Sequence, residues 1–164
     1  MSASTMLISS PVGPLVLQSD GSSLTGAHFA EETALSVNDS FPDAVVVEAA
    51  HQLAAYFAGE LRDFDLPLAP SGTPFRQRVW AELCAIPFGA TASYGDIAAR
   101  LGIPVSASRA VGLANGANPI AIIQPCHRVI GSDGTLVGYA GGLHRKRFLL
   151  GLESPSVQNP LFDD

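Results

Sequence analysis

A cysteine stands directly beside a histidine in residues 125–129, which read Pro-Cys-His-Arg-Val. The thiolate is the nucleophilic form of cysteine, and a nearby histidine can lower the pKa of the thiol or accept its proton. Neighbours in sequence do not always touch, so a buried cysteine beside a surface histidine is the plain alternative. Pro125 favours the chemical interpretation, because its ring fixes φ and biases Gln124 toward an extended backbone. We therefore expect a rigid, irregular loop that presents the thiol of Cys126, with His127 as its neighbour.

The second cysteine, Cys84, falls in a predicted helix without an adjacent base, and we expect it to be a small core side chain. Two cysteines make no disulfide framework, and a nucleophilic thiol needs a reducing compartment, so the cytoplasm is the expected location. Too few cysteines and histidines cluster to predict a metal site. The chain lacks an apolar run of about 18 residues and a signal-peptide pattern, so no membrane segment is expected.

The elements that must position the cysteine loop are mostly helical. Thr73-Pro74 favours a helix start, and Pro87-Phe88-Gly89 ends that helix. Residues 93–116 predict a helix-turn-helix, in which Ser93 caps a first helix over 94–101 and a second helix runs from about 106 to 114. Small residues fill the second helix: Ala107, Ser108, Ala110, Gly112 and Ala114.

A last helix is predicted over about 143–153. Its basic start, residues 144–147, is expected on a solvated or phosphate-facing surface, and Phe148, Leu149 and Leu152 are expected to pack inward. Residues 154–164 are expected to form a loosely ordered tail.

The first 70 residues predict a small antiparallel sheet with one helix. Apolar segments over 5–9, 14–18 and 24–29 are separated by turn signals and predict strands. Asp43 fits the N-cap of a helix over 44–58, and Gly59 fits its end. Residues 31–42 are expected to be loop, and residues 64–68 alternate as an edge strand would. The predicted fold class is α+β, with an N-terminal α/β domain over 1–70 and a mostly helical domain over 71–153.

The net charge of −6 is distributed unevenly along the chain. Residues 1–70 hold nine Asp and Glu against one Arg, whereas residues 71–164 hold eight Lys and Arg against six Asp and Glu. The asymmetry indicates that only the second half meets phosphates. An acidic, solvated first half without any link to nucleic acid is the alternative.

The Pro-Cys-His-Arg-Val sequence resembles the active-site motif of the O6-alkylguanine-DNA alkyltransferases. Further motifs of that family follow in order: Ser93-Tyr94-Gly95, Ser108-Arg109-Ala110-Val111-Gly112, Asn118-Pro119, Gly138-Tyr139-Ala140-Gly141-Gly142, and Glu153 at the end of the last helix. The match runs from about Thr73 to Glu153, whereas the N-terminal part resembles the family only loosely. The resemblance makes residues 71–153 the DNA-binding and active-site domain.

The resemblance implies a role for five catalytic residues. Cys126 is the nucleophile, His127 takes its proton through a water molecule, and Glu153 orients and supports the histidine. Tyr94 donates to the guanine and helps it leave, and Asn118 holds the active-site loop. The family requires no cofactor, and although some relatives carry zinc in the N-terminal part, that part has no cysteine here, so no metal is expected.

The resemblance also implies how DNA is bound. The second helix of the helix-turn-helix approaches the minor groove, where its small side chains let the backbone come close and Arg109 fills the place of an extruded nucleotide. A surface arginine in a salt bridge would be the ordinary explanation of Arg109 without the motif. The residues expected to contact DNA or the base are Arg109, Ala110, Gly112, Arg128, Val129, Tyr139, Ala140 and Gly141.

The expected function is therefore DNA repair by direct reversal: irreversible, single-turnover transfer of an alkyl group from O6-alkylguanine in double-stranded DNA to Cys126, with O4-alkylthymine as a further substrate. A monomer is expected, and alkyl-size preference and cooperativity on DNA stay open. Two alternatives remain, a non-catalytic sensor of alkylated DNA and a helix-turn-helix regulator. The presence of Cys126 argues against the first, and the scarcity of base-reading side chains in the second helix argues against the second.

Overall fold

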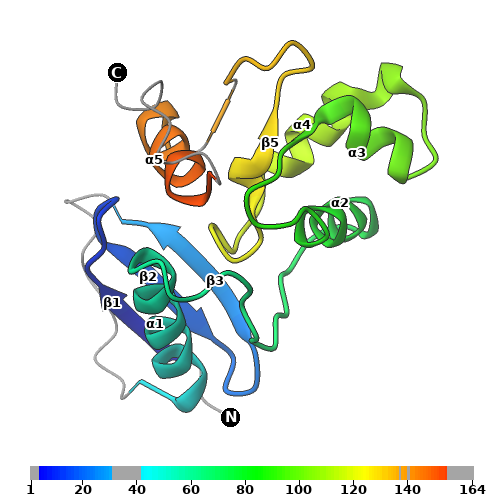
Figure 1. Ribbon diagram of the computed structural model, residues 1–164. Helices are drawn as coiled ribbons and strands as arrows, with labels where there is room; N and C mark the ends of the chain where they lie inside the picture. Colours follow the sequence, from blue (N-terminus) through cyan, green and yellow to red (C-terminus); the bar gives the residue numbers. More distant parts are fainter. Residues whose placement is uncertain (1–3, 31–41, 137, 140, 155–164) are drawn as a thin grey trace. The chain divides into compact units, whose positions relative to one another are not determined.

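The computed structural model describes residues 4–30, 42–136, 138–139 and 141–154 (Figure 1). The chain divides into two compact units. Unit 1 consists of Met1–Ser71 with Pro119–Ile123, and unit 2 consists of Gly72–Asn118 with Gln124–Asp164. The expected loop over 31–42 lies almost wholly outside the described residues, as do Ala140 and the tail beyond Ser154.

Unit 1 holds a three-stranded antiparallel sheet in the order β1-β2-β3, from Ser4–Ile8, Leu15–Ser19 and Leu24–Phe29. The three strands confirm the sequence prediction to within two residues at each end. One helix, α1 (Ala44–Phe57), contacts all three strands. Its buried side chains are Val46, Ala49, Leu53 and Tyr56, and the sheet buries Leu15, Leu17 and Leu24. Alternation in the strands and helical spacing in α1 thus produce a single apolar layer between them.

The ends of α1 follow local rules. The Asp43 carboxylate accepts a hydrogen bond from the backbone N–H of Val46 at 3.0 Å, which satisfies one of the free amides of the first turn. Gly59 has a φ of 78° and donates to the carbonyl of Tyr56 just past the helix end. The edge strand predicted over 64–68 is wrong, because only Leu68 bridges to the sheet, at Leu24.

A segment distant in sequence completes unit 1. Residues Pro119–Ile123 pair with β3 through Ala27, which donates to the carbonyl of Pro119 and accepts from the N–H of Ala121, both at 2.9 Å. Ile120 and Ile122 of this segment are buried. Ile122 has a φ of 73° and the N–H of Ile123 reaches back to the carbonyl of Ala121 at 2.8 Å. This is the strained form of the γ-turn, unusual for a β-branched residue.

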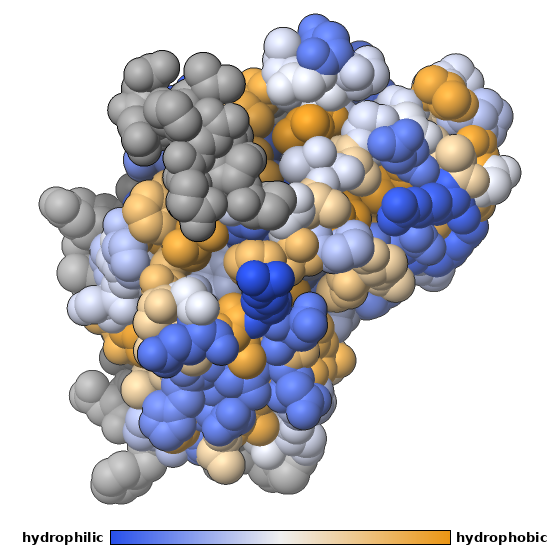
Figure 2. Space-filling view, viewed as in Figure 1, coloured by the Kyte–Doolittle hydropathy of each residue, from blue (hydrophilic) through white to orange (hydrophobic). Residues whose placement is uncertain are grey.

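The described residues of unit 2 form four helices, two short strands and two 3-10 turns. The helices are α2 (Pro74–Cys84), α3 (Tyr94–Arg100), α4 (Ser108–Gly116) and α5 (Leu143–Glu153); the strands are β4 (Ala92–Ser93) and β5 (Val129–Ile130); the 3-10 turns are η2 (Val105–Ala107) and η3 (Cys126–Arg128). Helices α3 and α4 are the predicted helix-turn-helix pair, with η2 opening the second helix. On the face drawn in Figure 2, apolar and polar side chains are mixed over this pair.

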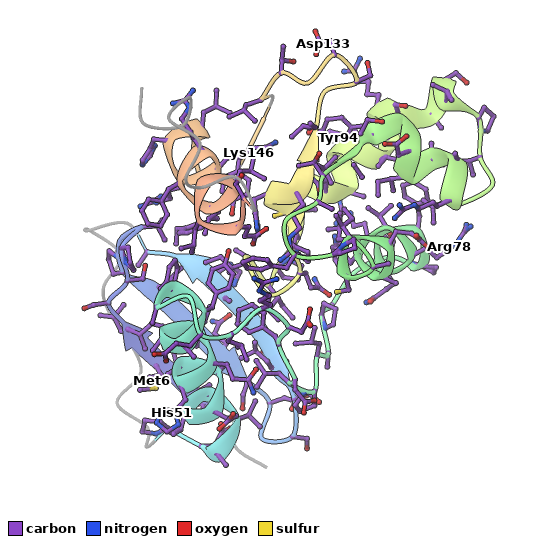
Figure 3. The ribbon with its side chains drawn as sticks, viewed as in Figure 1. Met6, His51, Arg78, Tyr94, Asp133 and Lys146 are labelled. Atoms are coloured by element: carbon purple, nitrogen blue, oxygen red, sulfur yellow. The ribbon has the colours of Figure 1, made fainter. Side chains whose placement is uncertain are left out.

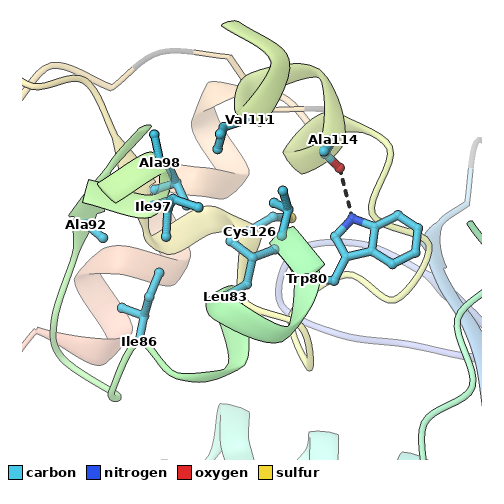
Figure 4. Packing of buried hydrophobic residues seen from close by; sticks show 11 residues of the cluster. Trp80, Leu83, Ile86, Ala92, Ile97, Ala98, Val111, Ala114 and Cys126 are labelled. Atoms are coloured by element: carbon cyan, nitrogen blue, oxygen red, sulfur yellow. Dashed lines mark hydrogen bonds between the residues drawn. The ribbon is translucent and has the colours of Figure 1, made fainter. Parts of the chain in front are cut away.

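The core of unit 2 lies between α2, α3, α4 and the turn that carries Cys126 (Figure 4). Val79, Trp80 and Leu83 of α2 are buried there, and the indole N–H of Trp80 donates to the carbonyl of Ala114 at 2.9 Å. Cys126 belongs to the same cluster. The side chain of Cys126 is therefore anchored in the buried apolar core of unit 2.

Two capped helix starts were predicted and are confirmed. The Thr73 hydroxyl accepts from the N–H of Arg76 at 3.2 Å. Ser93 and Asp96 exchange two hydrogen bonds, of 2.9 and 3.0 Å, as a capping box at the start of α3. β4 pairs in parallel with β5, which places the start of α3 beside the strand that follows the cysteine.

Two packing predictions are wrong. Cys84 is exposed, because α2 turns the neighbouring Leu83 inward. Phe148 is also exposed, at 43%, since the buried face of α5 consists of Lys146, Leu149 and Glu153. Two polar residues can occupy that face because both have partners inside unit 2. In the part of the chain that the structure describes, no helix has the length and apolarity needed to cross a membrane.

Candidate active site

The cysteine loop is built from a tight turn fixed by two amides. Pro125 has φ −80° and ψ 67°, and the N–H of Cys126 donates to the carbonyl of Gln124 at 2.7 Å, which is an inverse γ-turn. The Asn118 side chain donates to the same Gln124 carbonyl at 2.7 Å and accepts from the Gln124 side chain at 2.7 Å. These three bonds fix the backbone that leads into Cys126.

Cys126 is 7% exposed. Burial raises the pKa of its thiol, and this effect outweighs the hydrogen bond from Asn118, the charge of Lys146 and the hydroxyl of Tyr139, which all favour the thiolate. Cys126 therefore rests as a protonated thiol, whereas the thiolate is the form in which cysteine is nucleophilic.

His127 is fully buried and bonded to Glu153. Its Nε2 lies 2.7 Å from Oε2 of Glu153, and because a carboxylate only accepts, Nε2 carries the hydrogen. Burial lowers the pKa of His127 despite the bond to Glu153, and the charges of Arg128 and Lys146 act in the same direction. The imidazole is thus neutral at rest. Its Nδ1 is buried, with no hydrogen-bond partner among the described residues, and remains available as a proton acceptor.

Glu153 also binds Arg128. The guanidinium donates from Nε to Oε1 at 2.7 Å and from Nη2 to Oε2 at 3.1 Å, in a two-pronged ion pair in which both side chains are buried. A third hydrogen bond runs from Nη1 to the carbonyl of Ile86 at 2.6 Å, and the guanidinium carbon lies 5.8 Å from the ring centre of Phe88. Arg128 therefore holds the side chain of Glu153 in place and lies against it as the oppositely charged partner.

Tyr94 is the first residue of α3 (Figure 3), and its phenol is near enough to Cys126 to interact with it electrostatically. Burial raises the pKa of its phenol, the negative charge of Cys126 adds to that rise, and a hydrogen bond from Asn115 opposes it. Asn115 is buried in the last turn of α4, and its amide also lies 3.4 Å from the carbonyl of Cys126. Gly112 faces the same tyrosine: a Cβ there would lie 3.6 Å from its ring.

The glycine-rich loop supplies the remaining groups. Tyr139 has its pKa raised by burial first and then by the charge of Cys126, so its hydroxyl faces the thiol as a donor. Gly141 is buried, and its carbonyl accepts from Nη1 of Arg145 at 3.2 Å. Lys146, in the first turn of α5, donates from Nζ to the carbonyl of Val129 at 2.6 Å and to that of Gly138 at 3.3 Å.

The structure thus gathers the five expected catalytic residues, Cys126, His127, Glu153, Asn118 and Tyr94, together with Tyr139 and Gly141, within unit 2. Arg109 and Ala110 are exposed on α4. Arg128 and Val129 are buried instead of lying at a surface, so neither side chain is placed to meet a phosphate. Within the described residues no group of three His, Cys, Asp or Glu could hold a metal ion.

Two residues of the site were not expected from the sequence. The one sequence signal for Asn115 was that it is polar and lies among small and apolar residues in the last turn of α4. Lys146 was expected at a surface but is 0% exposed, and a lysine at i−3 from the buried Leu149 and i−7 from Glu153 shares their helix face. Helical spacing from Glu153 would have predicted its inward position.

Known proteins share both halves of the chain. Residues 74–155 match the 6-O-methylguanine DNA methyltransferase DNA-binding domain, and residues 5–70 match the ribonuclease-like domain of the same family. The methylated-DNA–protein-cysteine methyltransferase of Mycobacterium bovis is 55% identical over 148 residues, covering 89% of each chain. That of Methanosarcina acetivorans is 52% identical over 150 residues, covering 90% of this chain and 96% of its own.

Solved structures of the same family resemble this chain as well. The crystal structure of Mycobacterium tuberculosis OGT in complex with DNA superposes with a TM-score of 0.81 at 51% identity, covering 99% of each chain. These matches extend over the N-terminal part, where the sequence motifs were sparse. With both domain matches and relatives above half identity over nine-tenths of its length, the chain belongs to the 6-O-methylguanine DNA methyltransferase family.

Proposed function

We propose that this protein repairs DNA by transferring the alkyl group of O6-alkylguanine to its own Cys126. One observation carries the proposal: a buried thiol lies in a fixed turn next to a neutral histidine whose Nε2 is bound by Glu153 and whose Nδ1 is available. This arrangement of nucleophile, base and orienting carboxylate is the one that activates a weak nucleophile at neutral pH.

The proton moves first. The Nδ1 atom of His127 accepts the proton of the Cys126 thiol, through a water molecule as the family implies. The imidazolium that forms is stabilised by Glu153 at 2.7 Å, and the thiolate is stabilised by its surrounding donors. Because burial holds the histidine neutral before this step, it is in the protonation state that a base requires.

The alkyl group moves second. A bond forms between Sγ of Cys126 and the alkyl carbon, while the bond between that carbon and O6 breaks and its electron pair stays with guanine. Tyr94 donates a proton to the departing base, so that guanine leaves neutral. The product is a thioether, which resists hydrolysis, so each molecule acts once and is consumed. No step calls for a cofactor, and the free thiol suits the reducing cytoplasm.

DNA engages the protein through α3 and α4. The O6 atom of guanine is inside the duplex, so the damaged nucleotide has to leave the base stack before a buried thiol can reach it. Helix α4 exposes Arg109 and Ala110. A monomer binds the minor groove through this helix, and Arg109 fills the vacated space in the stack.

The two cysteines provide a matched test. Incubation with duplex DNA containing O6-methylguanine is followed by intact mass and peptide mapping, with an O4-methylthymine duplex as a second arm. Wild-type protein should gain one methyl group on Cys126, Cys84→Ser should do the same, and Cys126→Ala should gain none while still binding the damaged duplex. A methyl group found on Cys84, or none in folded wild-type protein, would overturn the proposal.

A further inference from the structure

Asn115 is the one amide side chain of α4, and it is 5% exposed in the last turn of that helix. Its Nδ2 atom donates to the carbonyl of Cys126 at 3.4 Å, whereas its Oδ1 atom is buried without a hydrogen-bond partner among the described residues. Turning the amide over would set Oδ1 against the carbonyl oxygen, so this contact fixes which way the amide points. A buried acceptor without a donor destabilises the fold, and a leucine of the same branched shape would avoid that cost. An asparagine at this position therefore calls for an explanation beyond packing.

The second half of α4 is held by three other elements of unit 2. From α2, the indole N–H of Trp80 donates to the carbonyl of Ala114 at 2.9 Å, the bond drawn as a dashed line in Figure 4. From α3, the ring of Tyr94 lies against Gly112, where a Cβ would be 3.6 Å from it. From η3, the carbonyl of Cys126 faces the last turn of the helix. This part of α4 is therefore the common support of the phenol and of the turn that carries the thiol.

The amide reaches the tyrosine as well as the cysteine turn. Gly112, which the ring of Tyr94 contacts, is three positions before Asn115 and shares its face of α4. A hydrogen bond from Asn115 acts to lower the pKa of Tyr94, so the amide donates and the phenol oxygen accepts. The two hydrogens of Nδ2 thus serve the carbonyl of Cys126 and the oxygen of Tyr94, and Oδ1 is left over. A phenol oxygen that accepts from one side has its own hydrogen directed to another.

We propose that Asn115 is a positioning residue for the alkyl transfer: it ties the phenol of Tyr94 and the carbonyl of Cys126 to the last turn of α4, so that the phenolic hydrogen is directed at the departing guanine. The inference rests on the proposed function, because the direction of that hydrogen matters only if Tyr94 protonates the guanine. It gives α4 a second task. The helix that carries Arg109 on its exposed face holds the proton donor through Asn115 on its buried face.

The test compares two reactions of the same thiol. Displacement of guanine from free O6-benzylguanine needs a proton for the departing base, whereas iodoacetamide releases iodide and needs none. Both reactions are followed at neutral pH without DNA, by intact mass and peptide mapping, in wild-type, Asn115→Leu and Asn115→Ala proteins. Leucine keeps the shape of the side chain without its N–H groups, and alanine removes it. Leu113→Asn is the matched control, because it makes the reverse exchange at a 69% exposed position of the same helix.

Asn115→Leu should slow the reaction with O6-benzylguanine about tenfold or more, which is part of what a well-placed general acid contributes. Its iodoacetamide rate should stay within about twofold of the wild-type rate, because no leaving group has to be protonated. Its thermal midpoint should be no lower than that of wild type, since the unpartnered acceptor is gone. Asn115→Ala should show the same change in the ratio of the two rates, and Leu113→Asn should keep the wild-type ratio.

A double-variant comparison tests whether the effect passes through the tyrosine. In a Tyr94→Phe background, Asn115→Leu should cause no further loss of rate with O6-benzylguanine, because the proton donor is already absent. Losses that add in full would show that Asn115 does not act through Tyr94. Equal losses in the benzylguanine and iodoacetamide reactions would show that it only shapes the turn around the thiol. Either result would overturn the inference.

The outcome is separable from the proposed function. If wild-type protein takes no methyl group from O6-methylguanine DNA, the proposed function fails, whatever the Asn115 variants do. If transfer occurs but the ratio of the two rates does not depend on Asn115, this inference alone fails.

Discussion

Replacing Glu153 by glutamine should disturb more than the histidine. The carboxylate accepts one hydrogen bond from His127 and two from Arg128, among its other interactions. A glutamine offers one oxygen and one NH2 group, so an amide hydrogen has to face either the guanidinium or the imidazole N–H. Glu153→Gln therefore leaves a buried guanidinium without its counter-charge.

The expected cost is large. Breaking a buried ion pair by removing one partner costs about 3–5 kcal/mol, mostly because the remaining charge stays buried and unpaired. Total stability of a domain is on the order of 5–15 kcal/mol. Removing both charges, in Arg128→Met with Glu153→Gln, should restore about 2 kcal/mol or more relative to the sum of the single changes, because no isolated charge remains.

Urea unfolding at neutral pH measures this coupling. Trp80 is the one tryptophan of the chain and is buried in unit 2, so its fluorescence follows the unit that contains the pair. Methyl transfer is measured on the same proteins by intact mass. The double variant should be folded yet slow in transfer, since His127 has lost the group that stabilises its charged form.

Two results would refute the reasoning. A Glu153→Gln protein destabilised by less than about 1 kcal/mol would mean that the guanidinium finds water or another partner, and that the pair is not buried in solution. A well-folded double variant that transfers methyl groups at the wild-type rate would remove Glu153 from the proton relay.

Three further predictions use single substitutions. Arg109→Ala should slow repair of duplex DNA about tenfold or more. Its reaction with free O6-benzylguanine should stay nearly unchanged, because the free base does not have to leave a base stack. Equal losses of rate on the duplex and on the free base would exclude a role of Arg109 in extruding the nucleotide. Burial lowers the pKa of His127 in the folded state, so stability should fall as pH drops below about 6.5, the pKa of an unfolded histidine, by up to about 1.4 kcal/mol per pH unit. The thermal midpoint of His127→Gln should fall less over the same range, and an unchanged slope would contradict the assignment. The Ile122→Gly protein should be more stable than the Ile122→Ala protein by about 1 kcal/mol, because φ is 73° at position 122 and glycine adopts a positive φ without strain. If the alanine variant had the higher thermal midpoint, the backbone at position 122 would not be strained.

Local sequence rules predicted the elements well. Helix starts at Asp43, Thr73 and Ser93 were predicted because capping depends on a side chain and an amide three residues away, which the sequence displays directly. The three N-terminal strands were predicted from alternation and turns. The strand over 64–68 failed because pairing needs a free sheet edge at the right place, which no local pattern encodes.

Long-range placement was harder to predict. The pairing of Pro119–Ile123 with Ala27 joins residues about 90 positions apart, and no periodic pattern marks it. Asn115 and Arg128 are polar, but they can be buried because groups on other elements form hydrogen bonds with them. Apolar spacing predicts which hydrophobic side chains face inward but is silent on polar residues that share the buried face.

The two buried cations explain why such residues are tolerated in the interior. Arg128 neutralises Glu153, and together with Lys146 it opposes protonation of His127, so the histidine stays a base although a carboxylate lies 2.7 Å away. Lys146 at the same time offsets part of the burial that raises the pKa of Cys126. A surface position would have left both charges in water, where the high dielectric constant weakens these effects severalfold. The basic residues that the sequence suggested for contact with DNA thus differ in placement: Arg109 is exposed on α4, whereas Arg128 and Lys146 are buried, where both lower the pKa of His127 and Lys146 lowers that of Cys126.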